Sequence, residues 1–308
     1  MMRSHGMPAV KRPRKPVVKL TVARVAKKKK KEFFILHYPL GTSISPSDVI
    51  SVRDELKYYA KVKKENLRID LILHSSGGDI YSAFKIIKTI RDYCSELLVI
   101  IPIRAVSAAS LLALGGDKIF LSSQSQMGPL DLPTEHPTIE GSRVSSIDVV
   151  QSIAYIEATL KNNATNRYLE LRDIGLGKRD AAITAYNIAI SFLQPLTSKL
   201  DPIQTSKSSR DLEIAKIYGK ELLVRYMFKN EIKKENVSEK TISSLVYDYP
   251  AHAFAICYEE AKNIGLVVDK SENYPDWDRA WKLNQKIDKL NKKIIWHFTE
   301  NQFDSWTK

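Results

Sequence analysis

The chain has 308 residues, of which 44% are hydrophobic and 27% charged, as in an ordinary soluble globular protein. Its formal charge is +13, but twelve Lys or Arg residues and no acidic residue fall within the first 31 positions, which leaves the rest of the chain close to neutral. No apolar run approaches the roughly 20 residues of a membrane-spanning helix, and two single cysteines exclude a disulfide framework, so we expect a soluble, cytoplasmic protein.

Residues 1–31 form the first predicted region, a basic arm. Three prolines and few large apolar side chains prevent it from burying enough surface to fold alone, so we expect it to be disordered. It contains no apolar core of the kind that a secretory signal requires. Its charge is suited to nucleic acid or to an anionic surface, and a solubilising tail without a partner is the equally simple alternative.

Strands and helices alternate along the next ninety residues. Apolar runs predict strands, and apolar residues at helical spacing predict the helices between them. The strands are expected at 33–38, 67–74, 97–103 and 118–122, and the helices at 45–62, 79–94 and 107–116. This alternation predicts an α/β fold whose sheet is mostly parallel and whose crossovers are right-handed.

The strand signal fades from about Ser145. Helices are predicted over 147–161, 179–196 and 210–228, with a polar spacer at 201–210. A last helix is predicted over 278–298, where apolar residues recur on one face. We expect this last helix to be an arm that packs on the body of the protein or on a neighbouring subunit.

Two adjacent glycines, Gly77 and Gly78, follow the apolar strand that ends at His74. They belong to no G-x-G-x-x-G motif, and no Lys-Ser/Thr pair of a P-loop follows them. Glycines here allow backbone N–H groups to point into a cleft at the carboxyl end of the sheet, where ligands of α/β folds bind. Such donors suit the oxygen of a tetrahedral intermediate.

Ser107 follows the next apolar strand and begins the helix expected at 107–116. A serine at this position is most often an N-cap, whose hydroxyl accepts a hydrogen bond from the backbone. The alternative is a nucleophile, since the helix dipole favours an oxyanion there and the N–H of Ala108 would be a second donor. The residues by themselves favour the cap.

Three blocks of sequence resemble a known family. They are "IDLILHSSGGDIYSAFKIIKTIR", "AVSAASLLALGGDKIFLSSQSQMGPLD" and, more weakly, "DYP" followed by "EEAKNIGLVV". Their order and spacing resemble the serine dehydrogenase proteinase family, which belongs with signal peptide peptidase A and the Clp protease in the ClpP/crotonase superfamily. The resemblance implies a spiral of ββα units over residues 32–270, with 271–308 as a helical arm. It also implies closed homo-oligomers and a cytoplasmic serine endopeptidase that cleaves peptides or unfolded protein through an acyl-enzyme.

The resemblance places the nucleophile on Ser107, which opens "SAASLLALG" in the register of the signal peptide peptidases. Ser110 is the alternative, because the Clp type has its serine after paired alanines. The oxyanion donors fall on Gly77 or Gly78 and on the N–H of Ala108. The resemblance implies no cofactor, and scattered histidines with single cysteines predict no metal site.

The base has two candidate sources. The signal peptide peptidases use a lysine, which corresponds here to Lys161, although a solvated surface lysine is the simpler interpretation. The Clp type uses Ser-His-Asp, for which His136 or His252 with Asp248 are the candidates. His74 is expected in the core or in a turn.

Some residues depart from the family's pattern. Ser-Ser-Gly-Gly replaces Thr-Pro-Gly-Gly, and "GPLDLP" replaces Gly-Pro-Ile-Asp-Pro-Gln. These departures leave a second hypothesis open, a catalytically inactive oligomeric module that binds peptides or nucleic acid. A crotonase-like enzyme acting on a coenzyme A thioester is less favoured, because the sequence contains no acid pair for hydration chemistry.

Overall fold

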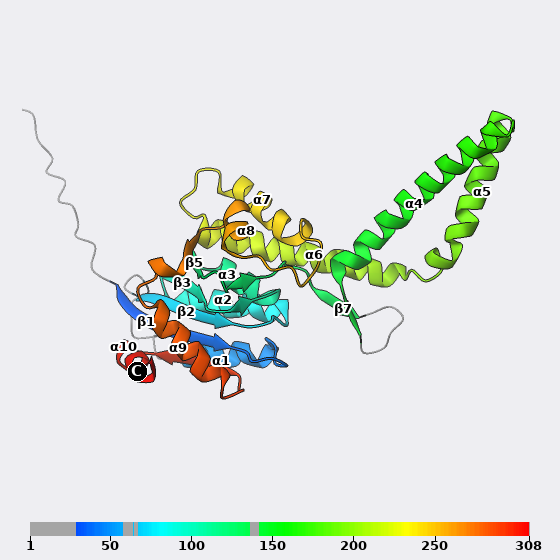
Figure 1. Ribbon diagram of the computed structural model, residues 1–308. Helices are drawn as coiled ribbons and strands as arrows, with labels where there is room; N and C mark the ends of the chain where they lie inside the picture. The colour runs from blue at the N-terminus through cyan, green and yellow to red at the C-terminus, as the bar shows by residue number, and fades with distance from the viewer. Residues whose placement is uncertain (1–28, 58–63, 65–66, 136–141, 308) are drawn as a thin grey trace, which may run out of the picture.

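The computed structural model describes residues 29–57, 64, 67–135 and 142–307. Its centre is a six-stranded sheet in the order β10-β1-β2-β3-β5-β9 (Figure 1). Neighbouring strands from β1 to β9 are parallel, and only β10 is antiparallel to its neighbour within this sheet. The predicted α/β class with a mostly parallel sheet is confirmed. The basic arm up to Lys28 and the candidate His136 lie outside the described residues.

The central parallel strands are mostly apolar, because both faces of the sheet are covered there, whereas the edge strand β9 is Val-Asp-Lys. Their bounds are β1 (Lys30–His37), β2 (Leu67–His74), β3 (Glu96–Ile101), β5 (Lys118–Leu121) and β9 (Val268–Lys270). Along β1, Phe34 and Leu36 face one core, whereas Phe33 and Ile35 face the other. β1 starts at Lys30, inside the segment expected to be an arm.

Helices cover both faces of the sheet. The larger core lies under α1 (Pro46–Leu56), α2 (Ile80–Tyr93) and α3 (Ala108–Leu114). α2 begins where the sequence suggests, since the Asp79 side chain accepts the N–H of Ser82 at 2.8 Å and so caps the helix. These helices follow the strands by short connections, which bring the loops after β2 and before α3 to the same end of the sheet.

Short β pairings hold the loops at this end of the sheet. β4 (Arg104–Ala105) pairs in parallel with β6 (Gln126–Met127), and an isolated bridge joins Ser75 to Ala105. A separate hairpin consists of β7 (Pro133–Glu135) and β8 (Arg143–Ser145). The bridge from Ser75 to β4 holds the chain after β2 against the chain that leads into α3.

The second half of the chain is mostly helical, as predicted. α4 (Ser146–Asp173) and α5 (Lys178–Thr197) form a hairpin that projects away from the sheet (Figure 1). α6 (Pro202–Leu222), a π-helical turn (Leu223–Met227) and α7 (Lys234–Tyr247) pack on the larger core, followed by α8 (Tyr258–Asn263). The polar spacer predicted at 201–210 is wrong. Residues 202–210 form the start of α6 instead, because Asp201 caps the helix and Pro202 occupies its first turn.

The helix predicted over 278–298 is also wrong in its second half. α9 (Trp277–Asp288), preceded by a 3-10 turn (Ser271–Asn273), is followed by strand β10 (Ile294–Phe298) and by α10 (Glu300–Thr307). β-Branched and aromatic residues in β10 favour a strand, and Asn291 turns the chain at a φ of +46°. α9 and α10 cover the second face of the sheet. No helix in the described part of the chain could cross a membrane.

Candidate active site

Ser107 stands at a sharp turn between β4 and α3. Its φ is +55° and its ψ is −123°, in a region that residues other than glycine rarely adopt. The residue is 4% exposed, and its Oγ lies 3.3 Å from the carbonyl oxygen of Asp131. It makes no capping hydrogen bond to α3, so the N-cap interpretation of this hydroxyl is wrong.

A conformation of this kind costs about 1–3 kcal/mol and persists only where the surrounding structure holds it. In the strand-to-helix turn that presents a nucleophilic serine in many hydrolases, the serine is strained in the same way. The strain at Ser107 therefore favours a chemical role over a capping role for its hydroxyl.

The glycine turn after β2 fits directly against Ser107. Gly77 and Gly78 have φ values of +106° and +144°, which favour glycine. A Cβ atom on Gly77 would lie 2.8 Å from the carbonyl oxygen of Val106 and 3.0 Å from the Cβ of Ser107. The turn is held from its other side by Ile44, whose N–H donates to the carbonyl of Gly77 at 2.9 Å. The paired glycines are thus required by backbone conformation and by close approach.

The three predicted oxyanion donors differ in their hydrogen bonds. The N–H of Gly77 donates to Ser75 Oγ at 3.0 Å and is engaged within the turn. For the N–H groups of Gly78 and Ala108, no acceptor is found within the described residues. An oxyanion hole needs donors that are free to bind the substrate oxygen. Gly78 and Ala108 meet that condition, and Gly77 does not.

Ser110, the alternative nucleophile, is committed to the fold. It is fully buried, and its Oγ lies 2.7 Å from the carbonyl oxygens of both Ala105 and Gly128. The same Oγ accepts the N–H of Gly128 at 3.0 Å. These contacts fasten α3 to the segment after β6, and they leave the hydroxyl unsuited to attack on a substrate.

Asp131 is a candidate site residue that sequence reasoning missed. Its carboxylate is 1% exposed and accepts hydrogen bonds from the backbone of Ile147 at 3.2 Å and from Ser145 Oγ. It also faces Nδ1 of His252, 3.5 Å away, while its own carbonyl oxygen faces Ser107. Its local signal is the "GPLD" turn, which is typical of the family but does not by itself give the aspartate a role.

His252 is the candidate base that the structure brings to this group. Its side chain is 32% exposed, and its Nδ1 is buried with no hydrogen bond among the described residues. Asp131 is thus the carboxylate that lies against this imidazole. Asp248, the predicted partner of the histidine, is instead exposed at the end of α7, and the structure describes no ion pair between it and His252.

Lys161 and His74 lie elsewhere. Lys161 is exposed on the projecting helix α4, about 22 Å along the helix from Ser146 at a rise of about 1.5 Å per residue. The structure therefore does not bring Lys161 to Ser107 within one chain. His74 is buried, as expected, and burial lowers the pKa of its imidazole to about 4.

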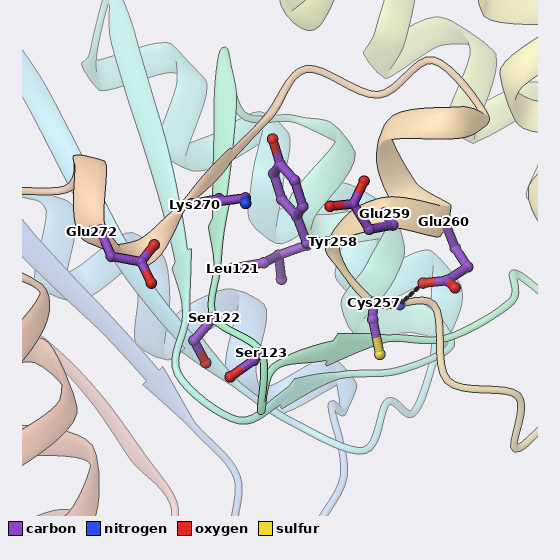
Figure 2. Close-up of a pocket in the computed structure, with 9 residues that line it drawn as sticks. All are labelled: Leu121, Ser122, Ser123, Cys257, Tyr258, Glu259, Glu260, Lys270 and Glu272. Carbon is purple, nitrogen blue, oxygen red and sulfur yellow. Dashed lines mark hydrogen bonds between the residues drawn. The ribbon is translucent and has the colours of Figure 1, made fainter.

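A cavity of about 330 Å³ opens beside the carboxyl ends of β5 and β9 (Figure 2). Its lining includes Ser122, Ser123, Cys257 and Lys270, together with three glutamates. None of the candidate catalytic residues lines it. Burial raises the pKa of the Cys257 thiol, which leaves a neutral and weakly reactive group in this cavity.

Comparison with protein families supports the resemblance. Residues 40–152 match the ClpP-like SDH-type serine proteinase family, and this segment contains the glycine turn, Ser107 and Asp131. Two proteins of Methanocaldococcus jannaschii, each described as uncharacterized, are 33% and 40% identical over 92 and 63 residues. These matches cover 30% and 20% of this chain and 32% and 22% of the relatives, so the chain aligns with about a third or less of each relative's length.

A solved structure is similar over a longer span at low identity. A mutant of 1510-N, a membrane-bound stomatin-specific protease, aligns with 83% of this chain and 86% of its own, at 11% identity and a TM-score of 0.45. That degree of likeness is too low to support a conclusion about function.

Proposed function

We propose that this chain, whose residues 40–152 match the ClpP-like SDH-type serine proteinase family, is a serine endopeptidase with Ser107 as its nucleophile. The observation that carries the proposal is the strained backbone of Ser107, with its side chain free of any capping role. The class of substrate, peptides or unfolded protein, follows from the family resemblance.

This geometry supports a mechanism of nucleophilic attack with an oxyanion hole. Ser107 Oγ adds to the carbonyl carbon of the scissile peptide, and the carbonyl oxygen becomes an oxyanion. The N–H groups of Gly78 and Ala108 supply the two donors that stabilise it. Breaking the C–N bond releases the amine, and water then hydrolyses the acyl-enzyme to regenerate Ser107.

His252 is the base that we propose for proton transfer. It accepts the proton of Ser107 during attack and returns it to the leaving amine, while Asp131 orients the imidazole. The support is the 3.5 Å separation between His252 Nδ1 and the buried carboxylate of Asp131, whose carbonyl also contacts Ser107. The role of Lys161 as the base stays a prediction. It would require Lys161 of one copy to reach Ser107 of another copy.

A second copy has support of its own. α5 exposes a series of large apolar side chains, with Ile183, Tyr186 and Phe192 each more than half exposed. A projecting hairpin with such a face is unusual for a monomer. We propose that the chain forms homo-oligomers through this hairpin, and mass photometry of the wild type against Phe192→Glu tests the point. A wild-type monomer at micromolar concentration would contradict it.

Peptide hydrolysis by matched serine variants tests the proposed activity. Ser107→Ala should reduce kcat by about 10⁴-fold or more, as loss of a nucleophile does. Ser76→Ala is the control, because Ser76 is exposed next to the same glycine turn. Equal loss in both variants would show that the turn is merely sensitive to change. An inactive wild type would favour the hypothesis of a binding module.

The base is assigned by a second set of variants. His252→Ala and Asp131→Asn should each lower kcat strongly while the fold is retained, and Lys161→Ala is the comparison. If Lys161→Ala is the inactive variant and His252→Ala keeps its rate, the lysine dyad replaces the histidine. Circular dichroism of each variant separates loss of chemistry from loss of fold.

A further inference from the structure

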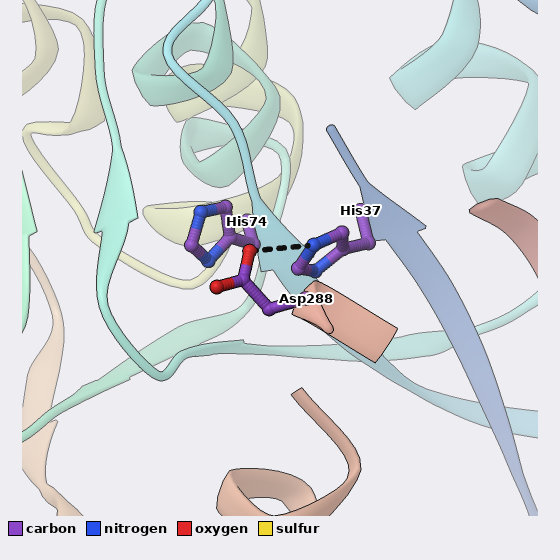
Figure 3. Close-up of side chains that lie close together, drawn as sticks. All are labelled: His37, His74 and Asp288. Atoms are coloured by element: carbon purple, nitrogen blue, oxygen red, sulfur yellow. Dashed lines mark ion pairs between the residues drawn. The ribbon is translucent and has the colours of Figure 1, made fainter. Parts of the chain in front are cut away.

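Three side chains with metal-binding atoms meet at one edge of the sheet (Figure 3). His37 and His74 are the last residues of β1 and β2, and Asp288 is the last residue of α9. Their potential ligand atoms all lie within 4.8 Å of one another. The sequence gives no spacing signal for this group, because its members are brought together only by strand pairing and by the packing of α9.

The hydrogen bond of His37 with Asn284 leaves the other ring nitrogen facing Asp288, where it could bind a metal ion. Its Nδ1 lies 3.1 Å from Asn284 Oδ1, so Nδ1 carries the proton and donates to that oxygen. The neutral ring then has a lone pair on Nε2, which is buried without a hydrogen bond and lies 3.4 Å from Asp288 Oδ1. A lone pair and a carboxylate oxygen at this distance repel each other unless a proton or a metal cation lies between them.

That separation fits a tetrahedral metal ion. Two ligands at zinc distances of about 2.0–2.1 Å are about 3.3–3.4 Å apart in tetrahedral geometry. The Asn284 oxygen that accepts the Nδ1 proton also plays the part of the outer partner that usually orients a metal-binding histidine. His37 and Asp288 thus need little movement to hold an ion.

His74 supplies the third ligand from the neighbouring strand. It is 2% exposed, its ring centroid is 4.5 Å from that of His37, and its Nδ1 is buried without a partner. Its Nε2 lies 3.5 Å from the guanidinium of Arg104, the limit of a hydrogen bond, and the Asn284 side chain also interacts with this ring. Metal binding through Nε2 would cost the weak contact with Arg104. The positive charge of Arg104 opposes a cation, and the carboxylate of Asp288 favours it.

We propose that His37, His74 and Asp288 form a binding site for a divalent cation of the zinc type. Two imidazoles and one carboxylate are ligands that zinc accepts, with a fourth position left for water. An ion there would hold the end of α9 against the ends of β1 and β2. His74, at the end of β2, stands three residues before Gly77. This site is independent of the proposed peptidase activity.

Zinc titration of the chelator-treated full chain tests the proposal. Isothermal titration calorimetry should show a site that is weakened by about tenfold or more in Asp288→Asn, since loss of a ligand exceeds the effect of losing an outer partner. Asp288 is chosen because its side chain is 53% exposed, so the variant should fold. Asp278→Asn, an exposed aspartate at the other end of α9, is the matched control.

Thermal unfolding gives a second measurement. Zinc should raise the Tm of the wild type and of Asp278→Asn, because ligand binding stabilises the folded state, and it should raise that of Asp288→Asn less. His37→Ala and His74→Ala should also lose the site if they fold. Absence of zinc binding by the wild type, or equal affinity in Asp288→Asn and the wild type, would overturn the proposal.

Discussion

Gly77→Ala tests whether the glycine turn is fitted to Ser107. The added methyl group meets two obstacles. The backbone of Gly77 has a φ of +106°, and the new Cβ would lie 2.8 Å from the carbonyl oxygen of Val106 and 3.0 Å from the Cβ of Ser107. Both neighbours belong to the turn that presents the proposed nucleophile, so relief of the contact has to move that turn.

The expected loss of stability has two parts. A left-handed conformation of this kind costs a residue with a side chain about 1–3 kcal/mol, and forcing a methyl group into a packed site costs about a further 1–3 kcal/mol. Gly77→Ala should therefore destabilise the protein by about 2–6 kcal/mol. Gly41→Ala is the control, because its φ is +83° and, apart from Gly41 and its chain neighbours, no described residue has an atom within 4 Å of the new Cβ. Its cost should be about 1–2 kcal/mol.

Two assays follow the substitution. Urea unfolding at constant m measures the loss of stability, and the rate of labelling by a fluorophosphonate probe measures the presentation of Ser107. Displacement of a reacting group by about 1 Å can cost about 100-fold in rate, so Gly77→Ala should label at least tenfold more slowly than Gly41→Ala. Equal stability and equal labelling rates in the two variants would refute the fit between the turn and the serine.

Three further predictions follow from the structure. Ser110→Ala should destabilise the protein by about 1–3 kcal/mol, since it leaves the buried N–H of Gly128 without its acceptor, and urea unfolding measures this. Lys161→Ala should unfold at the wild-type urea concentration, because its side chain is exposed, and a large shift would contradict its placement. Asp117 is partly buried, which opposes ionisation, but hydrogen bonds from Arg91 and Lys229 hold its pKa below the ordinary value of 3.8. The ionised Asp117 stabilises the folded state above pH 3.8, and this stabilisation is lost as the pH falls through the lowered pKa. In Asp117→Asn, the free energy of unfolding should therefore fall less steeply with decreasing pH in the acid range than in the wild type.

Much of the sheet could be predicted because its strands are long apolar runs between breaks. β2 was predicted at Leu67–His74 and has those bounds. β10 was missed for a physical reason. "IIWHF" continues the helical spacing of α9, and only pairing with β1, more than 250 residues earlier in the chain, stabilises it as a strand. At the start of α6, Asp201-Pro202 is a helix-start signal, but the polar composition of the segment that follows favours a spacer.

The candidate site was predictable in part. The glycine turn and Ser107 are local in sequence and carry recognisable small-residue patterns. Asp131 and His252 are 121 positions apart, and although Asp131 stands in the "GPLD" turn, nothing in the local sequence shows that the two residues meet. Lys161 illustrates the opposite error, since a plausible separation along the chain says nothing about a helix that projects from the body.

The claim that Ser107 is the nucleophile is tested most directly by mapping a fluorophosphonate adduct on the wild-type chain by tandem mass spectrometry. The geometry predicts one modified residue, Ser107, with no adduct on Ser110, whose hydroxyl is bound to Ala105 and Gly128. An adduct on another serine, or an unmodified Ser107 in a folded protein treated with excess probe, would contradict the assignment.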